Sequence, residues 1–169
     1  MVVVEHPGQH AGVEADAAVT ATPGCALVVR TADCAPVVLS GRRTVAVLHL
    51  GWRGLLADLV ARTVAVMAEL DDRPVAAELG ACIRPGCYEF VGPELDTVVD
   101  RFGHGVRGTT TAGRPALDLP ATVRAALAEV GVDRVEEHGG CTACDPRWYS
   151  HRGRREAERF ATVAWIEAA

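Results

Sequence analysis

The segment TADCAPVVLSGRRTVAVLHLGWRGL, residues 31–55, places a cysteine and a histidine on either side of a short basic turn. The two runs that flank the turn are rich in valine and have strand length, so we predict an antiparallel hairpin across Ser40–Arg43. A symmetric hairpin with this loop pairs Cys34 directly with His49. Opposed residues project to the same face with Cβ atoms about 4.5–5.5 Å apart. The sequence therefore predicts that this thiol and imidazole share one ligand or one proton.

Three interpretations of the Cys34 and His49 pair stay open at this point. A thiolate and an imidazole are good zinc ligands, and a catalytic site would add a third protein ligand and a water molecule. Without a metal, the same pair can act as nucleophile and base, because an adjacent histidine lowers the pKa of a cysteine. Both residues can also be packed hairpin residues, since buried thiols are common and inert.

Two further residues lie beside this pair. Gly51-Trp52-Arg53-Gly54 follows His49 and opens a helix, so Arg53 and the backbone N–H groups could receive an anion such as phosphate. The alternative is a surface arginine beside a tight turn. Asp33 is adjacent to Cys34 and would point to the opposite face of a strand, so we expect it to cap the backbone and not to act in catalysis.

The elements that must position these residues alternate between strands and helices without a repeat, which favours an α+β fold. The chain has 169 residues and 49% hydrophobic content, enough for one core, so we predict a single domain over 1–169. The predicted strands are Cys25–Arg30, Pro36–Leu39, Thr44–Leu48, Val75–Leu79, Val132–Glu136 and Arg159–Ile166, after a very short strand at Val2–Val4. The predicted helices are Leu55–Leu70, Pro93–Phe102 and Leu119–Val130, with loops over residues 5–24 and 103–115.

Composition limits the partners. The net charge of −5 comes from 22 acidic and 17 basic residues without long runs of either sign, which argues against nucleic acid and favours a small soluble substrate. We find neither a membrane span nor a secretory leader, and we expect a cytoplasmic protein. Its six cysteines are then expected to be free thiols, metal ligands or core residues.

A collinear series of motifs resembles the laccase-domain family, whose members are variously called multicopper polyphenol oxidases, peptidoglycan-editing factors and purine nucleoside phosphorylases. The segments are ADAAVT at 15–20, TADCAPVVL at 31–39, HLGWRGL at 49–55, CYEFVGPEL at 87–95, LDLP at 117–120 and CTACDPRWYSHR at 141–152. The resemblance implies a zinc site with Cys34, His49 and a histidine from an upstream Q-V-H-G motif. We expect the chain to begin just after that motif. Gln9-His10-Ala11-Gly12 looks like a substitute, so His10 is the candidate third ligand.

The resemblance also implies an activity: phosphorolysis of adenosine, inosine or methylthioadenosine, with adenosine deamination as a companion reaction. In that case Arg53, His151 and Arg152 are candidate contacts for phosphate or nucleoside. The alternatives are a copper-dependent polyphenol oxidase, a metal-free Cys-His hydrolase acting on peptidoglycan precursors, and an inactive, truncated metal-binding domain. Loss of an N-terminal strand would expose a sheet edge, so a homo-oligomer is also expected.

A second group of cysteines has spacing that suits a metal or redox site. Cys141 and Cys144 form a C-x-x-C pair, and Cys82 with Cys87 could complete a four-cysteine structural site if the loops meet. Cys25 falls within an apolar run and is expected in the core.

Overall fold

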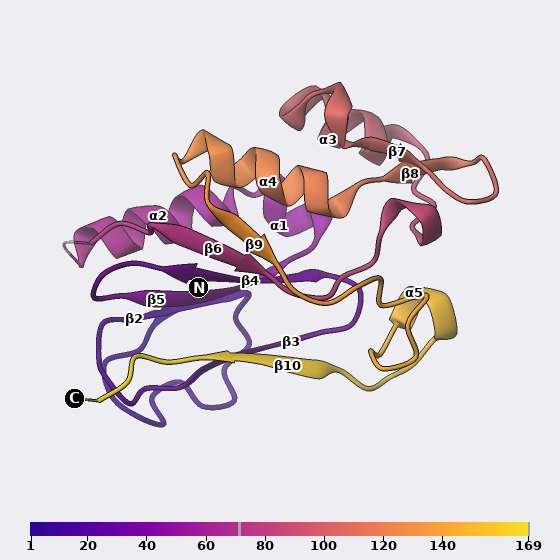
Figure 1. Cartoon of the computed structure of the whole chain (residues 1–169). Coiled ribbons are helices and arrows are strands. Elements are labelled where there is room, and N and C mark those ends of the chain that lie inside the picture. Colours follow the sequence, from indigo (N-terminus) through magenta and orange to yellow (C-terminus); the bar gives the residue numbers. More distant parts are fainter. Residues whose placement is uncertain (71, 169) are drawn as a thin grey trace.

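A mixed six-stranded sheet forms the centre of the computed structural model, which describes residues 1–70 and 72–168 (Figure 1). The strand order is β1-β2-β5-β4-β6-β9, and the neighbours are antiparallel except for the parallel pairs β1–β2 and β6–β9. The α+β prediction is therefore confirmed. The strands are β1 Val2–Val3, β2 Ala17–Thr20, β4 Ala35–Ser40, β5 Val45–Leu50, β6 Ala76–Leu79 and β9 Val135–Glu137.

Helices cover one face of the sheet (Figure 1). Leucine, valine and methionine side chains from these helices pack on the inward side chains of β4, β5 and β6, and Leu39, Leu48 and Met67 are fully buried. This is the larger of the two cores. It fixes the start of β4, next to Cys34, and the end of β5, which carries His49. The helices are α1 Trp52–Leu56, α2 Leu59–Glu69, α3 Pro93–Phe102 and α4 Leu119–Glu129.

An antiparallel ribbon of two strands, β3 Leu27–Thr31 and β10 Phe160–Ala164, covers the other face (Figure 1). Leu27 and Val29 of β3 are buried against Val45 and Val47 of β5, whereas Val28, which points the other way, is 52% exposed. The central strands are thus buried on both faces, as their continuous apolar runs predict.

The predicted hairpin register is wrong. Pro36 and not Cys34 lies opposite His49, and Ser40 pairs with Val45 across a turn at Gly41–Thr44. The register moves because Asp72, distant in the sequence, accepts hydrogen bonds at Oδ2 from the backbone N–H groups of Arg43 and Thr44.

Three other element predictions need correction. The helix predicted over Leu55–Leu70 breaks into α1 and α2, because Asp58 adopts a left-handed conformation with φ 53°, which aspartate tolerates. The supposed loop at 103–115 contains a helical turn, η2 His104–Val106, and most of a small hairpin of β7 Arg107–Thr109 and β8 Pro115–Leu117. The supposed N-terminal loop contains β2, and the chain adds two short helical elements, η1 Pro85–Cys87 and α5 His151–Arg154.

Over the described residues, every helix is too short or too polar to cross a bilayer.

Candidate active site

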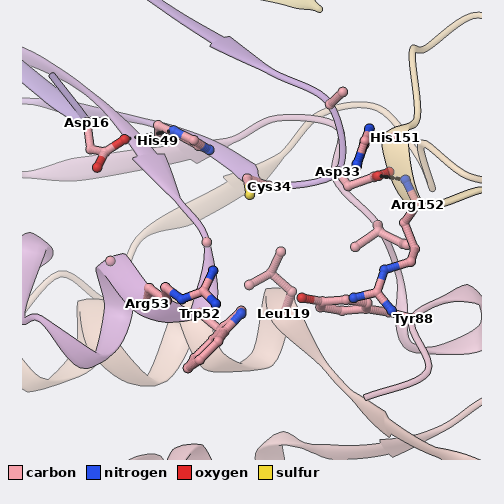
Figure 2. Close-up of a pocket in the computed structure, with 14 residues that line it drawn as sticks. Asp16, Asp33, Cys34, His49, Trp52, Arg53, Tyr88, Leu119, His151 and Arg152 are labelled. Atoms are coloured by element: carbon pink, nitrogen blue, oxygen red, sulfur yellow. Dashed lines mark hydrogen bonds and ion pairs between the residues drawn. The ribbon is translucent and has the colours of Figure 1, made fainter. Parts of the chain in front are cut away.

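A pocket of about 410 Å³ opens where β4 and β5 meet α1 and the segment around α5 (Figure 2). Its walls carry a thiol, an imidazole, cationic side chains and aromatic rings on elements far apart in the sequence. Figure 2 shows Asp16 and His49 on one side, and Asp33, His151 and Arg152 on the other, with Cys34 between them. The lining residues are Asp16, Ala32, Asp33, Cys34, His49, Gly51, Trp52, Arg53, Gly54, Ile83, Tyr88, Leu119, His151 and Arg152.

Cys34 and His49 meet in this pocket despite the corrected register. Cys34 lies one step beyond the Ala35–Leu50 pair, where a Cβ on Gly51 would be 3.0 Å from its Sγ. The true register differs from the predicted one by two residues, and such a shift keeps alternate side chains on the same face. The thiol and the imidazole are therefore diagonal and not direct neighbours.

His49 is oriented by Asp16, which the sequence reasoning missed. The Nδ1 atom of His49 lies 2.9 Å from Oδ1 of Asp16, and its backbone N–H donates to the Asp16 carbonyl at 2.8 Å. A carboxylate only accepts hydrogen bonds, so this contact places a proton on Nδ1 and leaves Nε2 of the neutral ring with its lone pair. A carboxylate behind a histidine is the usual arrangement for imidazoles that bind metals.

Cys34 is held as a neutral thiol. Burial raises its pKa to about 11, and the carboxylates of Asp33 and Asp16 add to the effect. A thiol in this state is a poor nucleophile at neutral pH. A bound cation would reverse the balance, because metal ions bind the thiolate.

Two arginines bring positive charge to the pocket from opposite sides. The guanidinium of Arg53 lies over the ring of Trp52, 4.5 Å from its centroid. That of Arg152 lies 5.2 Å from the centroid of Tyr88, and its Nη1 donates to the Glu89 carbonyl at 3.2 Å. Stacking on aromatic rings fixes the planes of the guanidinium groups while leaving other N–H donors available for an anion.

Aromatic rings form the apolar floor of the pocket. Trp52 packs edge-on against Phe90 with centroids 5.5 Å apart, and Tyr88 packs against the same ring at 5.4 Å. Burial raises the pKa of Tyr88 to about 12, so its hydroxyl stays protonated and can donate a hydrogen bond. Figure 2 shows this hydroxyl directed toward Leu119 and Trp52, across the cavity from His49.

Asp33 ties the two halves of the pocket together. Its Oδ1 accepts hydrogen bonds from the hydroxyls of Thr142 at 2.7 Å and Ser150 at 2.6 Å, and its Oδ2 accepts from the backbone N–H of Arg152 at 2.6 Å. Its backbone adopts φ 87°, so the alternation expected of a strand does not apply there. Asp33 accepts a hydrogen bond from a backbone N–H, as expected of a capping residue, but the prediction that it faces away from Cys34 is wrong, because both residues line the pocket. Asp33 links Cys34 to the segment that carries His151 and Arg152.

The structure separates His10 from this group. His10 lines another pocket, of about 300 Å³, together with residues of β1, β2 and β3, whereas Cys34, His49, Arg53, His151 and Arg152 share the first one. In the described part of the chain, the one close group of three or more Cys, His, Asp or Glu ligand atoms is formed by Cys87, Cys141 and Cys144. Of the three ligands that the resemblance implies, the structure brings Cys34 and His49 into the pocket and leaves His10 outside it.

These features define an α+β protein whose pocket combines soft metal-ligating donors, anion-binding arginines and an aromatic floor. The chain belongs to the family described as multi-copper polyphenol oxidoreductase laccase, whose model matches residues 1–167. A purine nucleoside phosphorylase of Xylella fastidiosa is 41% identical over 160 residues, which are 90% of this chain and 61% of that protein. One of Mycobacterium tuberculosis is 36% identical over 169 residues, covering 98% of this chain and 67% of that one. The chain thus spans about two thirds of the length of these relatives.

Solved structures share the fold. The Neisseria meningitidis protein NMB0706, described by the family model DUF152, superposes with a TM-score of 0.83 at 28% identity, covering 99% of this chain and 71% of that one. YlmD of Geobacillus stearothermophilus superposes with a TM-score of 0.83 at 22% identity, which supports the fold alone.

Proposed function

We propose that the chain carries the catalytic pocket of a zinc-dependent purine nucleoside phosphorylase that acts on adenosine, inosine or methylthioadenosine. The observation that carries the proposal is the meeting of Cys34, His49, Arg53 and Arg152 in one pocket with an aromatic floor. The names of the relatives support the same activity. Pockets of about this volume suit small-molecule ligands of nucleoside size.

Zinc fits the chemistry of the available donors, since it takes both thiolate and imidazole ligands. Sγ of Cys34 and Nε2 of His49 would hold it, with Asp16 keeping the imidazole in the ligating tautomer. When bound, the metal would supply a Lewis acid that polarises a phosphate or ribose oxygen. Copper is the alternative ion, because it favours the same two donors.

The side chains then divide the work of phosphorolysis. Arg53 and Arg152 would hold the phosphate dianion through charge-assisted hydrogen bonds. The rings of Trp52 and Tyr88 would pack against the purine. A phosphate oxygen attacks C1′ of the ribose, the bond from C1′ to the purine nitrogen breaks with its electron pair, and the departing base takes up a proton. His151 lines the pocket and would donate that proton, while the neutral Tyr88 hydroxyl, whose pKa is raised to about 12, would donate a hydrogen bond to the base.

The competing Cys-His hydrolase is disfavoured by the state of the thiol. Burial raises the pKa of Cys34 to about 11, and His49 is paired with Asp16 and lies diagonal to the thiol, so no feature of the pocket generates a free thiolate.

The test is metal analysis and adenosine turnover on the same samples of the wild-type chain and of Cys34→Ala. We expect adenine release that requires phosphate, and a loss of more than about 100-fold in the variant, since even groups behind a ligand are worth 10–100-fold. Cys25→Ala is the matched control, because Cys25 is buried in the other core. Inosine formation without phosphate reports adenosine deamination separately. A zinc-loaded, folded chain that turns over none of the three nucleosides would contradict the proposal.

A further inference from the structure

Three cysteine sulfurs gather outside the pocket. Cys87 ends η1, and Cys141 and Cys144 lie in the loop after β9. Their Sγ atoms all lie within 4.8 Å of one another, and those of Cys87 and Cys144 are 2.7 Å apart. We call this group the cysteine cluster. Tetrahedral Zn–S bonds of about 2.3 Å separate sulfurs by about 3.8 Å, so small side-chain rotations would seat an ion between the three.

The backbone holds the cluster in place before any ion binds. Cys82 and Cys141 form a parallel β-bridge, and Thr142 N–H donates to the Cys82 carbonyl at 3.2 Å. Cys144 N–H donates to the Cys141 carbonyl at 3.2 Å, which closes the C-x-x-C turn. Because the chain is already fixed, binding there would require little further loss of conformational entropy.

The electrostatics differ between members of the cluster: the hydrogen bond with Cys144 raises the pKa of Cys87 to about 12, whereas the surroundings of Cys141 favour negative charge. Burial alone would raise the pKa of Cys141, but the backbone N–H groups of Arg84 and Cys144, the thiol of Cys144 and the N–H of Ala143 lower it below its ordinary value. The Arg84 N–H lies 3.4 Å from Sγ. Backbone N–H groups that converge on the first sulfur of a C-x-x-C turn stabilise a thiolate without needing a charged side chain.

We propose that Cys87, Cys141 and Cys144 form a second metal site, separate from the pocket, that binds one thiophilic cation such as Zn²⁺ through three thiolates. Binding releases the thiol protons to solvent and involves no oxidation or reduction. The fourth position faces solvent, since Cys144 is exposed. Of the four cysteines that could have formed one structural site if the loops met, Cys87, Cys141 and Cys144 come together, and the Cys82 sulfur lies outside the cluster.

The consequence of such a site is structural. Cys87 precedes Tyr88, which lines the pocket, and the loop that carries Cys141 and Cys144 continues to His151 and Arg152. An ion on the cluster would fasten these two segments together behind the pocket wall. This role is independent of which reaction the pocket performs.

The test separates the two sites by removing the donors of the first. The Cys34→Ala/His49→Ala chain is reduced, stripped with a chelator and titrated with Zn²⁺, and its cysteines are then alkylated with iodoacetamide and located by peptide mass spectrometry. We expect about one equivalent of retained zinc and protection of the three cluster cysteines. Adding Cys144→Ala should lower zinc affinity by more than about tenfold, since loss of a ligand exceeds loss of a group behind one. Cys25→Ala, in the same background, is the control.

Circular dichroism on the same samples shows whether each variant folds. Where Cys144→Ala does not fold, the protection assay in the background that retains all three cluster cysteines decides the question alone. Alkylation of Cys87, Cys141 and Cys144 that is indifferent to zinc would overturn the proposal. So would a disulfide between Cys87 and Cys144 that forms equally with and without zinc.

Discussion

The molecule places thiols in two contrasting environments, the pocket and the cysteine cluster. Cys34 is half-buried beside two carboxylates, and burial raises its pKa to about 11. Cys141 of the cysteine cluster faces backbone N–H groups and the thiol of Cys144, which lower its pKa. The pocket thiol is therefore kept neutral, whereas in the cluster the pKa of Cys141 is lowered and that of Cys87 is raised to about 12 by its hydrogen bond with Cys144. The difference shows that position relative to backbone dipoles and carboxylates, more than the presence of cysteine, sets the chemistry of each site.

Asp33 connects the two environments. It precedes Cys34 in the chain, and its carboxylate accepts a hydrogen bond from Thr142, which lies between Cys141 and Cys144. Its other contacts reach Ser150 and Arg152. The contrast between the two environments can be tested by substitutions in the pocket, by comparing the reactivity of the two thiols, and by substitution of Asp33.

The largest effect is expected on the pocket side, from Asp16→Asn. An amide in place of the carboxylate can still accept a hydrogen bond from Nδ1 of His49, but it no longer raises the basicity of Nε2. We expect zinc affinity of the pocket, measured by competition with a chelator, to fall about 10–100-fold. Zinc protection of the cluster should not change.

Glu14→Gln supplies the matched control, because Glu14 is an exposed carboxylate two residues away. Equal loss of zinc in both variants would mean that bulk negative charge, and not the contact with His49, matters.

The second prediction sharpens the contrast between the thiols themselves. At pH 8 a thiol with a pKa of about 11 is ionised to about one part in a thousand, whereas Cys141, whose pKa is lowered, is ionised to a much larger fraction. The lower nucleophilicity of the more acidic thiolate offsets part of this difference. We expect Cys141 to alkylate about tenfold faster than Cys34 in chelated protein, by timed iodoacetamide labelling and peptide mass spectrometry.

The pH dependence has a definite sign. Below its pKa, labelling of Cys34 should rise about tenfold per pH unit up to about pH 11, because only the thiolate reacts. Labelling of Cys141 should level off at a lower pH. If the labelling rates of the two cysteines had the same pH dependence, the predicted difference between their pKa values would be contradicted.

Local patterns in the sequence predicted much of the fold. The bounds of α3 match the prediction because Pro93 can start a helix and Gly103, with φ 87°, ends one. The valine-rich runs of β4 and β5 gave buried strands at nearly the right residues. The hairpin register could not be predicted, because Asp72 reaches its turn from another part of the chain.

In the pocket too, local sequence predicted some residues, while others are brought in by contacts between distant parts of the chain. Cys34, His49 and Arg53 stand out through residue type and spacing, and the structure brings them together. Asp16 was missed because it precedes β2, in a stretch without periodicity, and only the pairing of β2 with β5 brings it to His49. Tyr88 is positioned in the pocket by η1 and by the packing of its ring on Phe90. Neither feature was predicted from the sequence pattern.

The smallest effect is expected from Asp33→Asn, at the residue that connects the pocket to the loop of the cysteine cluster. The amide oxygen can still accept hydrogen bonds from the hydroxyls of Thr142 and Ser150, but its NH₂ group then faces the N–H of Arg152, and two donors meet. Loss of this buried contact should destabilise the fold by about 1–3 kcal/mol. The thermal midpoint should fall by about 2–4 °C for each kcal/mol in a chain of this size.

The same variant shows whether Asp33 couples the pocket to the cysteine cluster or only stabilises its own turn. Because Thr142 lies between Cys141 and Cys144 in the sequence and Arg152 lines the pocket, we expect Asp33→Asn to weaken zinc protection of the cluster and also to raise the KM for phosphate. Glu158→Gln, an exposed carboxylate of the same C-terminal stretch, should change neither. A lower thermal midpoint with both sites intact would show that Asp33 holds only its own turn. The pocket and the cluster would then be independent, and the contrast between their thiols would arise separately at each.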